Sequence, residues 1–143
     1  MKRVKYRPLC IIESPYSGDV ETNLAYLSLC IADSIKRGET PYASHQMIAA
    51  ASALDDSDPE ERQLGIDCGL ALYPYARSVA FYVELGWSRG MKAALEYAVQ
   101  RNAACESARI EIEFRAVMPG SPEFQVGYDE GTALLDSLFG GVL

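Results

Sequence analysis

The sequence is poor in the side chains that usually bind metal ions. Its single histidine is His45, and no two of its cysteines form a CxxC pair. The four cysteines are scattered along the chain, at Cys10, Cys30, Cys68 and Cys105. Structural zinc sites usually combine closely spaced cysteines and histidines, so we expect no metal site. The cysteines are expected to stay reduced and to pack as small apolar residues.

The sequence also lacks long apolar runs and an excess of positive charge. No stretch approaches the roughly eighteen apolar residues that a membrane-spanning helix needs. The formal net charge of −7 disfavours binding to a nucleic acid polymer through its phosphates. Residues 1–15 are basic, but their apolar stretch, Leu9 to Ile12, is too short for a secretory signal. We therefore expect no membrane partner, no nucleic-acid partner and a cytoplasmic location.

Strand and helix patterns alternate up to about residue 116. The predicted strands are residues 7–14, 39–45, 77–85 and 108–117. The predicted helices are residues 19–38, 46–54, 58–76 and 88–102. Such alternation is typical of a largely parallel sheet with right-handed crossovers. We therefore predict an α/β fold with a mostly parallel sheet flanked by helices.

Capping residues and the spacing of apolar residues predict where these helices begin and end and which faces are buried. Asp19 and Ser88 are placed to cap the starts of two helices, and Gly38 to end the first of them. The apolar face of that first helix is predicted from Leu24, Leu27, Cys30 (or Ile31) and Ile35. The last strand alternates apolar residues with Glu111, Glu113 and Arg115, which predicts an edge strand with one solvent-facing side.

The composition changes after residue 116. Residues 117–143 contain two prolines, Pro119 and Pro122, and several glycines. We predict an α/β domain over residues 1–116, followed by a linker and C-terminal helical arm over 117–143. The arm's helix, predicted over 129–139, docks on the core or on a neighbouring subunit. Three aromatic residues are assigned equally to a subunit contact or to the core, namely Tyr73, Tyr75 and Trp87.

Three polar segments follow the first three predicted strands: "SPYSG", "YASH" and "LGWSRGM". In an open parallel sheet, ligands collect at the carboxyl ends of strands, so these segments predict a binding site. Ser88 and Gly90 begin a helix whose free N–H groups attract anions, and Arg89 adds a positive charge. The alternative for this segment is an ordinary serine-capped helix.

The other two segments leave similar alternatives. Tyr16 suits stacking on a base or sugar, and Gly18 a turn, but both also suit an ordinary strand-to-helix turn. His45 is either a ligand contact or general acid, or a side chain with a local hydrogen bond. The aspartates of the next loop are predicted to be solvated and not metal ligands, namely Asp55, Asp56 and Asp58.

Four stretches resemble nucleoside 2-deoxyribosyltransferase-like proteins of the short bacterial and phage type. They are "IIESPYSGDVETN", "GETPYASH", "LDDSDPEERQLGIDCGLAL" and "VAFYVELGWSRGMKAALEYA". The resemblance spans about residues 4–116 and implies a single Rossmann-like or flavodoxin-like domain. It also implies activity at the N-glycosidic bond of a nucleoside or nucleotide without a cofactor, and assembly as a homo-oligomer, a dimer or larger.

The candidate substrate-binding residues combine these lines of reasoning. They are Ser14, Tyr16, Gly18, Asn23, His45, Ser88, Arg89, Gly90 and Met91. The resemblance assigns the 5′-phosphate of a nucleoside monophosphate to the segment that begins at Ser88. It assigns the sugar and base to the first loop.

One position departs from the resemblance. The family's nucleophilic glutamate falls at Ala94, which has no lone pair to attack a sugar. Either this chain is an inactive variant, or another carboxylate at a strand end reacts, Glu13 or Glu84, or the protein binds a nucleotide without turnover. We expect a nucleotide N-glycosidase or deoxyribosyltransferase-like enzyme. The alternatives are a sequestering or sensing protein, and an assembly protein with a vestigial pocket.

Overall fold

The four strands form one parallel sheet. The computed structural model describes residues 1–44 and 53–140. Its strands are β1 (Leu9–Glu13), β2 (Thr40–Tyr42), β3 (Ser78–Tyr82) and β4 (Glu111–Arg115). Their order in the sheet is β2-β1-β3-β4, and every neighbouring pair is parallel. The predicted α/β fold, a single Rossmann-like domain, is therefore confirmed.

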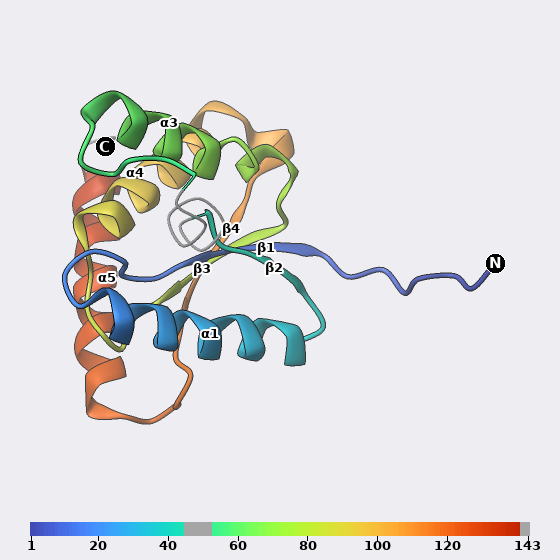
Figure 1. Ribbon diagram of the computed structural model, residues 1–143, viewed down its shortest axis with the longest axis horizontal. Helices are drawn as coiled ribbons and strands as arrows, with labels where there is room; N and C mark the ends of the chain where they lie inside the picture. The colour runs from blue at the N-terminus through green and yellow to red at the C-terminus, as the bar shows by residue number, and fades with distance from the viewer. Residues whose placement is uncertain (45–52, 141–143) are drawn as a thin grey trace.

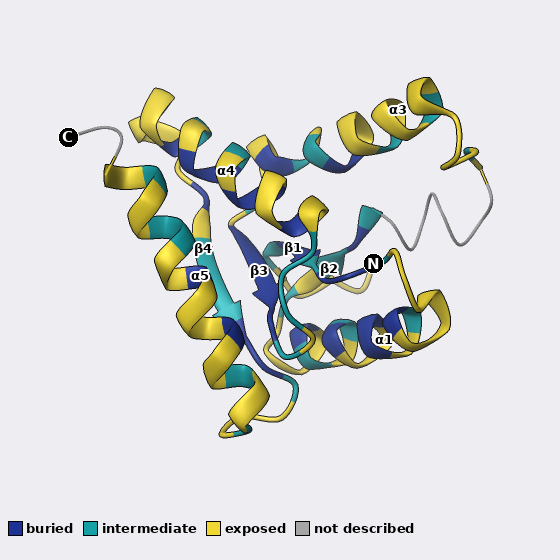
Figure 2. Cartoon of the chain, turned by 90° about the vertical axis from the view of Figure 1, so that its left-hand side faces the viewer, coloured by how far each residue is buried: buried dark blue, intermediate teal, exposed yellow. Residues whose placement is uncertain are grey.

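Helices lie on both sides of this sheet. They are α1 (Val20–Lys36), α3 (Pro59–Leu70), α4 (Arg89–Ala104) and α5 (Pro122–Gly140), with short 3₁₀ turns at Tyr73–Tyr75 and Glu106–Ala108. Figure 1 shows their course along the chain. Figure 2 shows α1 on one side, α3 and α4 on the other, and α5 along β4. In the described ranges, no helix has the length and apolar character needed to cross a bilayer. The helix predicted over 46–54 falls largely outside the described residues.

Side chains alternate between the two faces of the central strands, as the pleat of a strand requires. Ile11, Val79 and Phe81 pack in the cluster that includes the buried face of α4. Ile12 and Tyr82 pack in the cluster that includes α1. All five residues of β3 are buried, which is expected of a strand that is covered on both faces.

The helix caps are as predicted, and so is part of the buried face of α1, because Leu27 and Cys30 are fully buried. The Asp19 carboxylate accepts a hydrogen bond from the Thr22 backbone N–H at 3.2 Å. The buried residues of α1 are Asn23, Tyr26, Leu27, Cys30 and Ser34. Ile35, which was predicted to be buried, is half exposed. Polar side chains take its place because they find partners: the Ser34 hydroxyl, for example, donates to Glu39 at 2.9 Å.

The edge strand β4 also differs from its prediction on one face. Arg115 was expected to face solvent, yet it is only 5% exposed. Its Nη1 and Nη2 each donate to one oxygen of the Glu39 carboxylate at 2.7 Å, and it also pairs with Glu113. A buried guanidinium is stable only when it is paired in this way. The charged face of β4 therefore contains a buried ion pair.

The C-terminal helix is longer than predicted and packs on the core. It begins at Pro122 instead of residue 129. The Trp87 indole Nε1 donates to the Gly127 carbonyl at 2.8 Å, and its ring stacks on Phe81 with 5.1 Å between centroids. Tyr73 is fully buried, whereas Tyr75 is 77% exposed. Of the predicted aromatic contacts, Trp87 and Tyr73 therefore belong to the core of this chain.

Two glycines, Gly127 and Gly131, let α5 come this close. A Cβ atom at Gly127 would lie 2.0 Å from the Val83 carbonyl oxygen. We expect Gly127→Ala to lower the free energy of unfolding by about 3 kcal/mol, because the helix must shift away from β3. Gly140 is the matched control, since a Cβ there would have no neighbour within 4 Å among the described residues. Urea unfolding measures both variants, and equal stabilities for them would show that α5 is not tightly docked.

Candidate functional site

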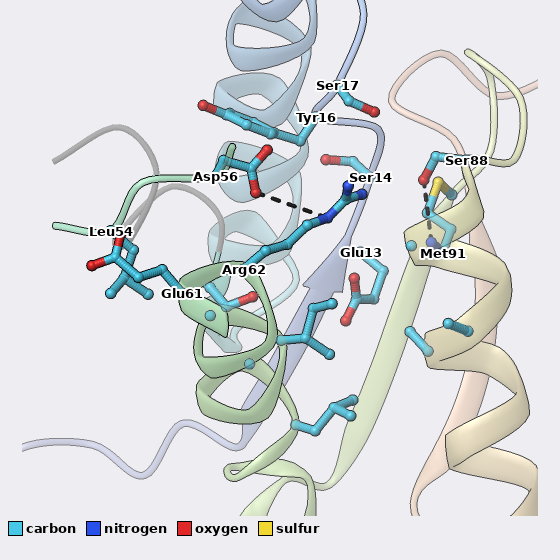
Figure 3. A pocket seen from close by; sticks show the side chains of 18 residues that line it. Glu13, Ser14, Tyr16, Ser17, Leu54, Asp56, Glu61, Arg62, Ser88 and Met91 are labelled. Carbon is cyan, nitrogen blue, oxygen red and sulfur yellow. Dashed lines mark hydrogen bonds and ion pairs between the residues drawn. The ribbon is translucent and has the colours of Figure 1, made fainter. Parts of the chain in front are cut away.

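A cavity of about 230 Å³ lies between the end of β1, the start of α4 and one side of α3. Figure 3 shows the side chains that line it. The predicted site residues that line it are Ser14, Tyr16, Ser88, Gly90, Met91 and Ala94. Ser44, from the segment after β2, also lines it. The three polar segments that follow β1, β2 and β3 therefore meet at one edge of the sheet, as the sequence predicts.

Three predicted contact residues do not line the cavity. Asn23 instead holds the loop after β1, because its Nδ2 donates to the carbonyls of Tyr16 and Ser17 at 3.0 Å each. Gly18 turns this loop with a φ of 98°, which side chains disfavour. Arg89 is exposed and points no group into the cavity lining. His45 lies outside the described residues.

Glu13, the last residue of β1, brings a carboxylate into the cavity. The hydroxyl of the buried Tyr73 donates to its Oε1 at 2.6 Å. Burial raises the pKa of Glu13 from 4.5 to about 7, although the hydrogen bond from Tyr73 works in the opposite direction. A carboxyl group that titrates near neutral pH in a cavity is a candidate for acid–base or nucleophilic chemistry.

Glu84, the other carboxylate proposed from the sequence, has a structural role. It accepts hydrogen bonds from the Tyr26 hydroxyl at 3.0 Å and from the Val117 and Met118 backbone N–H groups. These contacts fasten the chain that leaves β4 to the end of β3. Glu84 is absent from the cavity lining. Of the two carboxylates proposed from the sequence, Glu13 is therefore the one that reaches the predicted site.

The start of α4 forms the wall where the sequence predicts an anion. The Ser88 Oγ accepts from the Met91 backbone N–H at 3.2 Å, so its own proton is available to a ligand. The first N–H groups of a helix have no partner within the helix and attract anions. Farther along the same wall, Ala94 is only 5% exposed and offers a methyl group.

Sequence reasoning missed the wall that α3 provides. Its lining residues recur every four positions, as Glu61 and Arg62, Gly65 and Ile66, and Gly69 and Leu70. Gly69 is the only buried residue of this helix. A Cβ at Gly69 would lie 2.6 Å from the Ser44 Oγ, so glycine lets the helix approach the loop after β2. The inner side of α3 thus faces a cavity, and it lacks the apolar stripe by which a sequence pattern marks the inner side of a helix.

The aspartates before α3 have separate roles. Asp58 caps the helix by accepting from the Glu60 backbone N–H at 3.0 Å, and Asp55 accepts from the Ser57 backbone N–H at 3.0 Å. Asp56 lines the cavity, where its Oδ1 lies 4.0 Å from the Arg62 Nε. The described residues contain no cluster of three side chains that could hold a metal ion.

The buried carboxyl of Glu13 has a consequence for stability. Its pKa is raised by folding, so the folded state disfavours the ionised form and loses stability as pH rises from about 4.5 to about 7. We expect Glu13→Gln to remove this loss, which amounts to at most about 3 kcal/mol at pH 8. Urea unfolding at pH 5 and pH 8 measures it. A variant that gains no stability over the wild type at pH 8 would show that Glu13 is well solvated.

Comparison with known proteins gives a family but no activity. No curated protein and no solved structure matches the chain. The resemblance to nucleoside 2-deoxyribosyltransferase-like proteins therefore stays a prediction. Residues 8–108, from β1 to the 3₁₀ turn before β4, match the family described as Domain of unknown function (DUF7768). The match includes every residue that lines the cavity. The chain belongs to this family of proteins with a domain of unknown function, DUF7768.

Proposed function

We propose that this chain cleaves the N-glycosidic bond of a nucleoside or deoxynucleoside monophosphate, with Glu13 as the reacting carboxylate. The observation that carries the proposal is the position of Glu13, on the lining of the cavity and with a pKa raised to about 7. The resemblance of the sequence to deoxyribosyltransferase-like proteins supports the type of bond. The homo-oligomer and the cytoplasmic location that were expected from the sequence remain part of this proposal.

The reaction would follow the chemistry of a carboxylate nucleophile. Ionised Glu13 adds to the anomeric carbon of the sugar, and the electron pair of the C–N bond leaves with the base, which takes a proton from water. The hydroxide that this water leaves behind then attacks the anomeric carbon of the glycosyl ester and breaks its C–O bond. The products are the free base, the sugar phosphate and the regenerated carboxylate.

The lining of the cavity supports this assignment. Ala94 stands where the resemblance expects the nucleophile, and Glu13 lines the same cavity from β1. Figure 3 shows the Glu13 side chain between β1 and the helix that carries Met91. A carboxylate that enters from the strand would replace the missing one on α4. Ser88 and the free N–H groups of α4 suit the phosphate, and Tyr16 suits the sugar or base.

The observation that favours a second function is the methyl group of Ala94 on the α4 wall. Without a carboxylate on that wall, the cavity would hold a nucleotide and release it unchanged. This second candidate is a protein that sequesters or senses a nucleoside monophosphate. The two functions differ in turnover, and the same set of variants separates them.

The enzymatic proposal is tested by base release from a panel of ribo- and deoxyribonucleoside monophosphates. We expect Glu13→Gln to lower the rate by roughly a thousandfold or more, because the amide is not a nucleophile. Glu84→Gln is the matched control, since Glu84 also stands at a strand end but lies off the cavity lining. Activity should rise with pH around pH 7, as Glu13 ionises.

Three outcomes separate the candidates. Base release that Glu13→Gln abolishes and Glu84→Gln preserves supports the enzyme. Monophosphates that bind tightly in calorimetry but never lose their base support the binding protein. Base release that survives in Glu13→Gln would contradict the role of Glu13 and require another group to react.

The hydrogen bond from Tyr73 gives a separate prediction about pH. Its hydroxyl stabilises the ionised form of Glu13, so Tyr73→Phe should raise the pKa of Glu13 further. We expect the acid side of the pH–rate profile to move to higher pH by about one unit. Tyr26→Phe is the matched control, because the Tyr26 hydroxyl donates to Glu84 instead. Equal profiles for the two variants would contradict a role for Tyr73 in tuning Glu13.

A further inference from the structure

Arg62 is the one basic side chain on the cavity lining within the described part of the chain. It shares this lining with three carboxylates, those of Glu13, Asp56 and Glu61. A phosphate group carries up to two negative charges and would be repelled by these carboxylates. Such a ligand therefore gains most from a position beside Arg62, whereas the carboxylates suit the hydroxyl and amino groups of a sugar and base.

The position of Arg62 leaves its guanidinium available to a ligand. Figure 3 shows the side chain extending from the first turns of α3 toward Ser14, in the loop after β1. Its Nε lies 4.0 Å from the Asp56 Oδ1, and the two side chains are 59% and 62% exposed. An exposed pair at this distance contributes little, so a phosphate can replace Asp56 as the partner of Arg62. Arginine binds phosphate oxygens with two parallel hydrogen bonds, which are among the stronger contacts in proteins.

We infer that Arg62 determines specificity for phosphorylated ligands: it contacts the 5′-phosphate and makes the cavity prefer a nucleoside monophosphate to the free nucleoside. This inference rests on the proposed function for the class of ligand. The sequence pattern assigned the positive charge at the phosphate to Arg89 of α4. The structure indicates Arg62 of α3 for this role instead.

Calorimetry with two matched variants tests this role. The probes are a panel of ribo- and deoxyribonucleoside monophosphates and the corresponding nucleosides, added to the Glu13→Gln protein so that no turnover interferes. We expect Arg62→Met to weaken binding of the monophosphates by roughly tenfold or more and to leave nucleoside binding within about twofold. Arg77→Met is the control, because the Arg77 Nε also lies 4.0 Å from a carboxylate, that of Glu111, with 62% of its side chain exposed. Arg62→Lys should restore part of the lost affinity through its charge.

The outcomes distinguish this inference from the proposed function. Monophosphates that bind to the Glu13→Gln protein in an Arg62-dependent way, but release no base when incubated with the wild type, would support the inference and contradict the enzyme. Equal losses for nucleosides and monophosphates in Arg62→Met, a comparable loss in Arg77→Met, or no binding of any probe would overturn the inference. Unchanged thermal unfolding of Arg62→Met shows that its effect on binding is local.

Discussion

The parallel pairing of β1 with both β2 and β3 decides where the loops that follow these strands meet. Ile11 is paired with Tyr42 on one side and with Val79 on the other, so the three strands run in step. Parallel strands end at the same edge of a sheet, and the loops that leave them must therefore start side by side. Glu13 occupies the last paired position of β1, opposite Phe81. A shift of this register by one residue would turn the carboxylate to the face covered by α1.

Two glutamates show how the same fold creates opposite environments for a carboxylate. Burial raises the pKa of Glu39, but hydrogen bonds from Arg115 and Ser34 outweigh it and hold that pKa below its usual value. Glu13 receives a hydrogen bond from a neutral hydroxyl, that of Tyr73, in place of an ion pair, so burial dominates and its pKa rises. Ionised Glu39 stabilises the folded state. Ionised Glu13 destabilises the folded state, and its carboxylate can interact with a ligand in the cavity. This difference separates a structural carboxylate from a candidate reactive one.

Local sequence patterns predicted the helices and strands of this fold. Features that depend on contacts between residues far apart in the sequence were not predicted. The alternation of strands and helices and the cap at Ser88 depend on neighbouring residues, and the structure confirms both. The burial of Arg115 depends on Glu39, which is 76 residues away, so its charge alone predicted a solvent-facing position. Arg62 was missed for a related reason: α3 faces a cavity and lacks the apolar stripe that marks the inner side of a helix. The sequence could place the edge of the sheet that carries the site, but not the helix that closes it.

The cavity also depends on residues outside the matched family region. Trp87 stacks on Phe81 and meets Phe114 edge-on with 5.2 Å between centroids, and its indole donates to Gly127 of α5. The next residue, Ser88, caps α4 and lines the cavity. If α5 moved away from the sheet, Trp87 would move with it. Ser88 is the next residue, so the movement would change the lining of the cavity. Since α5 and β4 follow residue 108, the shape of the α4 wall is a property of the whole chain and not of the shared domain alone.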